Sequence, residues 1–188
     1  MELIEKYDLI KQELLTAKGK NPFHIALSIM RKDYINMHGP EHHFLDGGAF
    51  LAAYVNAGGH LDLEAALETL KGRTMAMPGA MCGFWGVCGS VTSLGAAMSI
   101  IYETGPLSTD EHYRDNMTYT SNVINKMAAI GGPRCCKRNA FTSISEAVKR
   151  INEKENLTME LTTIKCGFYK KNPSCIEARC PYYPTLAR

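Results

Sequence analysis

Cysteine side chains concentrate in the last third of the sequence. Five of the seven cysteines lie there: Cys135, Cys136, Cys166, Cys175 and Cys180. The last three form the pattern C-x8-C-x4-C-P in a segment without helical or strand periodicity. Such a segment needs an external reason to become ordered, and a bound metal supplies one. Because thiolates are good ligands for zinc and for iron–sulfur clusters, we expect these five residues to form a metal site.

The spacing of these cysteines bears on which metal they hold. Zinc ribbons pair their ligands as C-x2-C, and this segment contains no such pair. A 4Fe–4S cluster takes four thiolates, so one of the adjacent Cys135 and Cys136 would be left beside the cluster. We therefore expect an iron–sulfur cluster (4Fe–4S) as the cofactor, with zinc as the alternative. Packing of buried thiols is the interpretation without a metal.

A second pair of cysteines, Cys82 and Cys88, lies in the string MCGFWGVCG. We place this string before or at the start of a helix, where the positive end of the helix dipole lowers the pKa of a thiol. Its glycines would let a substrate or cofactor approach the backbone. We expect active-site thiols or additional cluster ligands here. A turn with two packed cysteines is the structural alternative.

Histidines gather in the string HGPEHH, which begins at His38. His38, Glu41 and His42 match the inverted zinc-protease pattern H-x-x-E-H. That pattern needs both histidines on one helix face, whereas Pro40 is tolerated only in the first turn of a helix. His38 would therefore lie outside the helix, which argues against a protease. His42 and Asp46 are four residues apart, so they could share a metal or orient each other.

These residues together predict a reactive cleft. One cysteine would act as a nucleophile or redox thiol, and His42 or Glu41 would act as the acid or base. The predicted catalytic residues are Cys82, Cys88, His38, Glu41, His42 and His43.

The elements that position these residues are predicted to be helices. Apolar side chains near the N-terminus recur every three or four residues, from Leu3 to Leu14. Asn21 and Asp62 are typical helix caps, and the Gly-Gly-Pro string ending at Pro133 stops a helix. We predict about seven helices, near residues 2–17, 22–32, 40–57, 62–71, 85–102 and 108–130, and from 143 onward.

Two of these helix starts rest on capping-box spacing, a serine followed three residues later by a glutamate. Ser108 with Glu111 predicts the start of the sixth helix, and Ser143 with Glu146 predicts the start of the seventh. Residues 158–165 are the single stretch that reads as a strand, and the pattern there is weak.

The expected fold class is all-α with an irregular Cys-rich C-terminal tail. We expect one domain over residues 1–188, made of a helical core at 1–157 and a metal-binding tail at 158–188. The chain has 188 residues, of which 45% are hydrophobic and 21% are charged. This composition is ordinary for a globular domain and excludes a disordered chain.

Charge and hydropathy limit which cellular compartment and which partners we expect. No apolar run reaches the roughly 18 residues of a membrane span, and the charged N-terminus does not read as a signal peptide. We therefore expect a cytoplasmic protein with reduced thiols and no membrane partner. Residues 131–188 carry eleven Lys and Arg against five Asp and Glu. Thiolates and a cluster would balance this charge, so nucleic acid is the weaker expectation for a partner.

Longer strings point to a family. They are MHGPEHHFL (37–45), LAAYVNAGG (51–59), PGAMCGFWGVCGS (78–90), PLS (106–108), GGPRCCKRN (131–139) and C-x8-C-x4-CPYYP (166–184). In these strings, which cover most of the chain, the sequence resembles an uncharacterised prokaryotic family, domain of unknown function 5714. Members of that family are sometimes labelled as, or fused to, S-adenosylmethionine-dependent methyltransferase-type proteins. This sequence shows no glycine fingerprint after a strand, so the resemblance implies functional Cys and His residues without naming a reaction.

The sequence thus predicts an intracellular metal-binding protein, with an iron–sulfur cluster and a Cys/His cleft. It would be a redox enzyme or a sulfur- or one-carbon-handling enzyme acting on a small-molecule substrate. The alternative is a structural zinc-binding accessory module that docks onto a partner enzyme such as a methyltransferase. The sequence decides neither whether the chain is an enzyme nor whether it forms a homo-oligomer.

Overall fold

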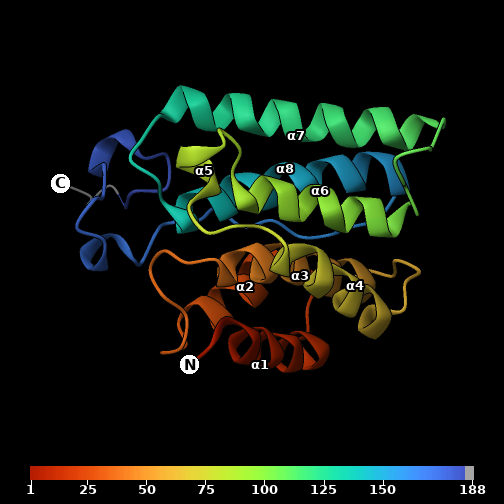
Figure 1. Cartoon of the computed structure of the whole chain (residues 1–188), viewed down its shortest axis with the longest axis horizontal. Helices are drawn as coiled ribbons and strands as arrows, with labels where there is room; N and C mark the ends of the chain where they lie inside the picture. Colours follow the sequence, from red (N-terminus) through yellow and green to blue (C-terminus); the bar gives the residue numbers. More distant parts are fainter. Residues whose placement is uncertain (185–188) are drawn as a thin grey trace.

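The computed structural model describes residues 1–184, which form an all-α fold (Figure 1). Its elements are α1 (Leu3–Thr16), α2 (Pro22–Met30), α3 (Glu41–Asn56), α4 (Leu63–Met75), α5 (Met81–Phe84), α6 (Gly89–Ile101), α7 (Glu111–Ile130), α8 (Cys136–Glu155) and the 3-10 turns η1 (Tyr169–Lys171) and η2 (Glu177–Arg179). The predicted fold class is confirmed, and the helix beyond the expected seven is the short α5. None of the helices in this part of the chain is long and apolar enough to span a membrane.

Helix α3 lies inside the bundle because most of its residues are apolar or small. Its residues from 41 to 54 are buried, including Phe44, Leu45 and Phe50. It packs against α1, α2, α4, α6 and α8. A helix surrounded in this way has no solvent-facing stripe. Each polar side chain at its start therefore needs a partner inside the protein.

Helices α3 and α6 approach each other closely at Gly47. The Gly47 amide donates to Ser93 Oγ at 3.0 Å. A Cβ atom on Gly47 would lie 2.5 Å from Ser93 Oγ and 2.9 Å from the Ser93 carbonyl oxygen. Only a residue without a side chain lets the two backbones come this close.

The observed helix caps agree with the sequence in two places and differ in a third. Asn21 caps α2 and Asp62 caps α4, each through its side-chain oxygen, as predicted. Helix α7 is capped by Asp110, whose carboxylate accepts the amides of residues 112 and 113. The Ser108 hydroxyl accepts the Gly105 amide instead, so the capping box predicted there is wrong.

The start of α8 is the larger correction. The predicted start was Ser143, but α8 begins at Cys136, seven residues earlier. Ser143 is fully buried in the middle of the helix. Glu146 forms ion pairs with Lys126 and Lys149 on the helix surface, so it is not a capping residue. The serine–glutamate spacing occurs here by helical periodicity alone.

A turn separates α5 from α6. The helix expected from residue 85 begins at Gly89, because Gly86 has a φ of +69°, which an α-helix does not accommodate. The turn leaves two large aromatic residues at the surface: Phe84 is 83% exposed and Trp85 is 68% exposed.

The C-terminal tail contains no strand in its described residues, so the weak strand expected at 158–165 is wrong. This segment is held by isolated bonds instead of a ladder. The Asn152 side chain bonds the amide and the carbonyl of Met159, and the Glu160 amide donates to the Lys20 carbonyl at 2.9 Å. The tail then covers the end of the bundle where α6 and α8 begin (Figure 1).

Candidate functional site

Four cysteines from two distant segments line one narrow pocket beneath the tail. Cys135, just before α8, lines it together with Cys166, Cys175 and Cys180. Burial raises the pKa of Cys166 and of Cys180, and the neighbouring thiols raise it further. We call this group the four-cysteine pocket. It brings together four of the five cysteines that the sequence predicted as metal ligands.

Backbone amides point at three of these sulfurs in a repeated pattern. The amide two residues after Cys166 donates to its Sγ at 3.4 Å, and the amide two residues after Cys175 does the same at 3.4 Å. A hydrogen bond from the amide two residues after Cys180 lowers the pKa of that thiol, although burial outweighs it. Donors placed in this way favour the thiolate form over the thiol.

Asn172 links the four-cysteine pocket to His38. Its Nδ2 donates to Cys135 Sγ at 3.7 Å, and its Oδ1 lies 3.2 Å from His38 Nε2. His38 Nδ1 accepts the Cys136 amide at 3.4 Å. Because Nδ1 accepts, we assign the hydrogen of neutral His38 to Nε2, from which it donates to Asn172.

The adjacent Cys135 and Cys136 face opposite sides. Cys135 has an extended backbone, with φ of −147° and ψ of 107°, and Cys136 is the first residue of α8. The Cys135 side chain lines the four-cysteine pocket, whereas the Cys136 side chain lines a second cavity. The structure thus separates the two residues that the sequence had left as interchangeable ligands.

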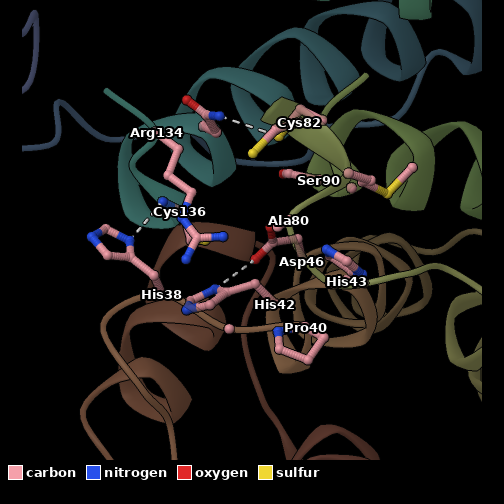
Figure 2. A pocket seen from close by; sticks show the side chains of 16 residues that line it. His38, Pro40, His42, His43, Asp46, Ala80, Cys82, Ser90, Arg134 and Cys136 are labelled. Atoms are coloured by element: carbon pink, nitrogen blue, oxygen red, sulfur yellow. Dashed lines mark hydrogen bonds and ion pairs between the residues drawn. The ribbon is translucent and has the colours of Figure 1, made fainter. Parts of the chain in front are cut away.

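We name the second cavity the His–Cys cavity; it lies where α3, α6 and α8 begin (Figure 2). Its volume is about 290 Å³. The polar and thiol residues that line it include His38, His42, His43, Asp46, Cys82, Cys88, Ser90, Arg134, Cys136 and Asn139. The cavity therefore brings together five of the six residues predicted to be catalytic.

Glu41 is the predicted catalytic residue that does not line the cavity. Its Oε1 accepts the Asn36 amide at 2.7 Å and lies 3.4 Å from Lys6 Nζ. Burial alone would raise the pKa of the Glu41 carboxyl, but backbone hydrogen bonds and the Lys6 charge hold it below its usual value of 4.5. The structure thus gives this carboxylate a positional role: it fixes the segment that leads into α3.

Several buried polar atoms in the His–Cys cavity have no hydrogen-bond partner within the described chain. They are both carboxylate oxygens of Asp46, Nδ1 of His42, Nδ1 of His43 and Oγ of Ser90. Asp46 is 0% exposed and His42 is 1% exposed. A buried polar group without a hydrogen bond costs about 1–3 kcal/mol. Four such side chains around one cavity indicate a ligand site.

Three buried side chains form a chain that ends at the cavity. Lys137 Nζ lies 2.7 Å from His42 Nε2 and 2.9 Å from the Asn36 carbonyl oxygen. His42 Nε2 also lies 3.4 Å from the Asn36 carbonyl, but the Lys137 ammonium is closer and only donates. We therefore assign His42 Nε2 as the acceptor and the imidazole hydrogen to Nδ1. His42 Nδ1 in turn lies 3.5 Å from Asp46 Oδ1. A buried lysine and a buried aspartate thus offset each other's charge through one histidine.

Burial dominates the pKa values of the cavity's thiols and imidazoles. It raises the pKa of Cys136 to about 12 and raises that of Cys88, although Asn139 Nδ2 donates to Cys88 Sγ at 3.2 Å. The predicted lowering at a helix start is therefore wrong for Cys88, because loss of water outweighs the helix end. Burial also lowers the pKa of His38 and His43, which favours their neutral form.

Sequence reasoning missed Ser90 and Asn139 as cavity residues. Asn139 lies three residues after Cys136, which is one helical turn further along α8. This spacing predicts that Asn139 and Cys136 share a helix face, but only if the helix is known to begin at Cys136. Arg134, one of the eleven Lys and Arg residues in 131–188, also lines the His–Cys cavity.

No group of three or more His, Cys, Asp or Glu side chains within residues 1–184 is arranged to hold a single metal ion. The four sulfurs of the four-cysteine pocket therefore do not converge on one point. Their chemistry still fits a thiophilic cofactor, because all four are soft donors and three face backbone amides.

A family model described as "Family of unknown function (DUF5714)" matches residues 10–183. This match confirms the resemblance seen in the sequence strings, and the link to methyltransferases stays a prediction. Neither a curated protein nor a solved structure matches the sequence.

Proposed function

The chain belongs to this family of unknown function, and we propose that it is an iron–sulfur protein with a reactive cavity beside its cluster. Cys135, Cys166, Cys175 and Cys180 hold a 4Fe–4S cluster in the four-cysteine pocket. The His–Cys cavity takes a small molecule for redox chemistry or for sulfur or one-carbon transfer. When bound, the cluster supplies one-electron chemistry.

The observation that carries this proposal is the meeting of four thiols from segments about thirty residues apart or more in the sequence. Thiols that merely pack in a core need no hydrogen-bond donors, whereas cluster thiolates are held and tuned by them. Two backbone amides and the Asn172 amide donate to sulfurs of this pocket at 3.4, 3.4 and 3.7 Å. This donor pattern supports thiolate ligands.

A cluster and a single zinc ion place different demands on four thiolates. A zinc ion needs its four sulfurs about 2.3 Å from one point. The described chain has no group of three such side chains around one point. In a four-iron cluster each thiolate binds a different iron, so the sulfurs stand further apart. The four-cysteine pocket offers the four thiolates that such a cluster takes.

The residues of the His–Cys cavity support the reactive role. Cys88 and Cys136 place two thiols in the cavity. Both are half-buried, with raised pKa values, so a base must take a proton before either can act as a nucleophile. Neutral His43 and the His42–Asp46 pair are the candidate bases.

Anaerobic purification followed by an absorbance spectrum and metal analysis of the same sample tests the cofactor. We expect a broad visible absorption band and about four irons per chain. A colourless protein with about one zinc per chain would contradict the cluster and favour the accessory zinc module instead.

A matched pair of variants tests the ligand assignment. Cys135→Ser should lose the visible band, because Cys135 lines the four-cysteine pocket. Cys136→Ser changes the neighbouring residue, which lines the other cavity, and should keep iron and the visible band. The double variant Cys175→Ser, Cys180→Ser should also lose the iron. Equal iron content in all of these proteins would overturn the assignment.

A further inference from the structure

We propose that the His–Cys cavity binds a free α-amino acid, with the ammonium group of the ligand on Asp46 and its carboxylate on Arg134. The inference deepens the proposed function, because it takes this cavity as the reactive one and names its substrate class. It rests on the buried carboxylate of Asp46, which accepts no hydrogen bond from the described residues, on the Arg134 side chain that lines the same cavity and on the size of the cavity.

Asp46 fixes one end of the ligand. Its side chain is 0% exposed, and neither oxygen accepts a hydrogen bond from any described residue. His42 Nδ1 lies 3.5 Å from Asp46 Oδ1. A carboxylate only accepts, so the missing partner must be a donor. An ammonium group offers three hydrogens and a positive charge. It suits a buried carboxylate whose Oδ1 lies 3.5 Å from His42 Nδ1 and whose Oδ2 accepts no hydrogen bond from the described residues.

The hydrogen-bond chain behind Asp46 argues against a metal ion as that partner. Lys137 Nζ, at 2.7 Å, donates to His42 Nε2, so we assign the imidazole hydrogen to Nδ1, facing Asp46. Nδ1 then has no lone pair with which to bind a metal beside Asp46. The arrangement of the described residues agrees, because no three potential ligands surround one point there.

Arg134 fixes the other end of the ligand. Its side chain lines the cavity and reaches into it on the side of His38 and Asp46 (Figure 2). The residue itself is exposed, so it lies at the mouth, where a ligand enters. A guanidinium group binds a carboxylate through two parallel hydrogen bonds. The start of α6, at Gly89 and Ser90, lines the same cavity and adds the positive end of a helix dipole.

Cavity size limits what can join these two groups. About 290 Å³ is at the lower end of the range for small-molecule sites. A buried acceptor and a cationic mouth in one small cavity call for a compact zwitterion, and an α-amino acid carries both groups on one carbon. Its side chain would then face the thiols of Cys82, Cys88 and Cys136.

Thermal-shift measurements on the purified protein with each of the twenty standard L-amino acids test the inference, followed by calorimetry on those that raise the melting temperature. We expect at least one amino acid to bind. Its decarboxylated amine and its desamino acid should each bind about tenfold more weakly or worse, because each lacks one charged group. Failure of all twenty to bind would overturn the inference.

Two variants and two controls locate the site. Asp46→Asn and Arg134→Gln should each weaken binding about tenfold or more. Arg134 is exposed, so its variant keeps the test decisive if Asp46→Asn does not fold. Asp8→Asn and Arg114→Gln change exposed charges away from the cavity and should leave the affinity unchanged. Binding that neither cavity variant weakens would contradict the assignment.

The same titration on the Cys175→Ser, Cys180→Ser protein separates the two proposals. Amino-acid binding there would show that the cavity works without the cluster. If the protein shows its full visible band but binds none of the twenty amino acids, the cluster proposal stands and the proposed substrate class is overturned.

Discussion

At the scale of single residues, Lys137 and Asp46 place two opposite charges in the protein interior. Lys137 is 1% exposed and Asp46 is 0% exposed. Removing either charge leaves the other buried without compensation, and such changes cost several kcal/mol. His42 alone connects them, so the three residues must act as one unit.

Replacing Lys137 with methionine isolates this effect. Lys137→Met removes the amine but keeps most of the side chain's volume. We expect the free energy of unfolding to fall by about 3 kcal/mol, because Asp46 loses its compensating charge. Urea unfolding followed by circular dichroism measures it.

Lys149→Met is the matched control, since the Lys149 side chain is 56% exposed in its ion pair with Glu146. That change should cost less than about 1 kcal/mol. Adding Asp46→Asn to Lys137→Met should recover part of the loss. A Lys137→Met protein as stable as the Lys149→Met protein would refute the charge-pair account.

Glu41 predicts a specific dependence of stability on pH. Hydrogen bonds from backbone amides hold the pKa of this carboxyl in the folded protein below its usual 4.5, against the effect of burial. The stabilisation is therefore present above pH 4.5 and is lost as the pH falls through the lowered pKa. Glu41→Gln should lower the free energy of unfolding by about 1–2 kcal/mol at pH 7.

The difference between Glu41→Gln and the unmodified protein should shrink as unfolding is measured below pH 4.5. Glu64→Gln, whose side chain is 72% exposed, serves as the control and should show little difference at either pH. A gap for Glu41→Gln that stays constant down to acid pH would mean that the carboxylate is not stabilised by the fold.

Single residues also mark the limit of what the sequence could predict. The clustering of Cys, His and Asp46 was visible because it depends on local spacing. The opposite directions of Cys135 and Cys136 were not, because they follow from an extended residue directly before a helix start. Glu41 looked like an acid or base by type, and only its bonds to Asn36 and Lys6 show otherwise.

At the scale of elements, the contact between α3 and α6 depends on glycine. Gly47→Ala would place a methyl group 2.5 Å from Ser93 Oγ and 2.9 Å from the Ser93 carbonyl oxygen. The helices must separate, so we expect a loss of about 2 kcal/mol in the free energy of unfolding. Thermal unfolding measures it.

Gly72 in α4 provides the opposite case. No atom lies within 4 Å of where its Cβ would be. Gly72→Ala should therefore stabilise the protein by about 0.5–1 kcal/mol through helix propensity alone. If both substitutions stabilised the protein, close packing of α3 on α6 would be excluded.

Element boundaries were predictable where a side chain acts locally. Asn21 and Asp62 cap their own helices, so pattern and structure agree. The helix start predicted at Ser143 was wrong because the spacing of a capping box equals about one helical turn. The same serine–glutamate spacing therefore also occurs inside a helix. The sequence did not predict the turn at Gly86 either, because a single residue with positive φ leaves the apolar pattern around it unchanged.

At the scale of the whole molecule, the two pockets share one end of the bundle. The starts of α3, α6 and α8 line the His–Cys cavity, and the tail closes the four-cysteine pocket beside it. His38 and Asn172 bridge the two through hydrogen bonds. The convergence could not be predicted from sequence, because it depends on how distant helices pack.

The proposed cluster also predicts how the tail responds to metal removal. Residues 158–184 are joined to the core by few backbone bonds, such as Glu160 to Lys20. Stripping the cluster should therefore speed tryptic cleavage after Lys165, Lys170 and Lys171 severalfold, while helix content measured by circular dichroism changes little. Equal cleavage rates with and without the cluster would argue that the tail is held by packing alone.

The turn after α5 has a practical consequence. The chain carries a single tryptophan, Trp85, which lies midway in sequence between Cys82 and Cys88 and is 68% exposed. Light at the long-wavelength edge of the aromatic absorption band excites this indole but not the nine tyrosines. Its fluorescence therefore reports on one segment, which carries two of the cavity's thiols. A ligand or quencher that binds at this segment would change the emission of the natural protein, without an added label.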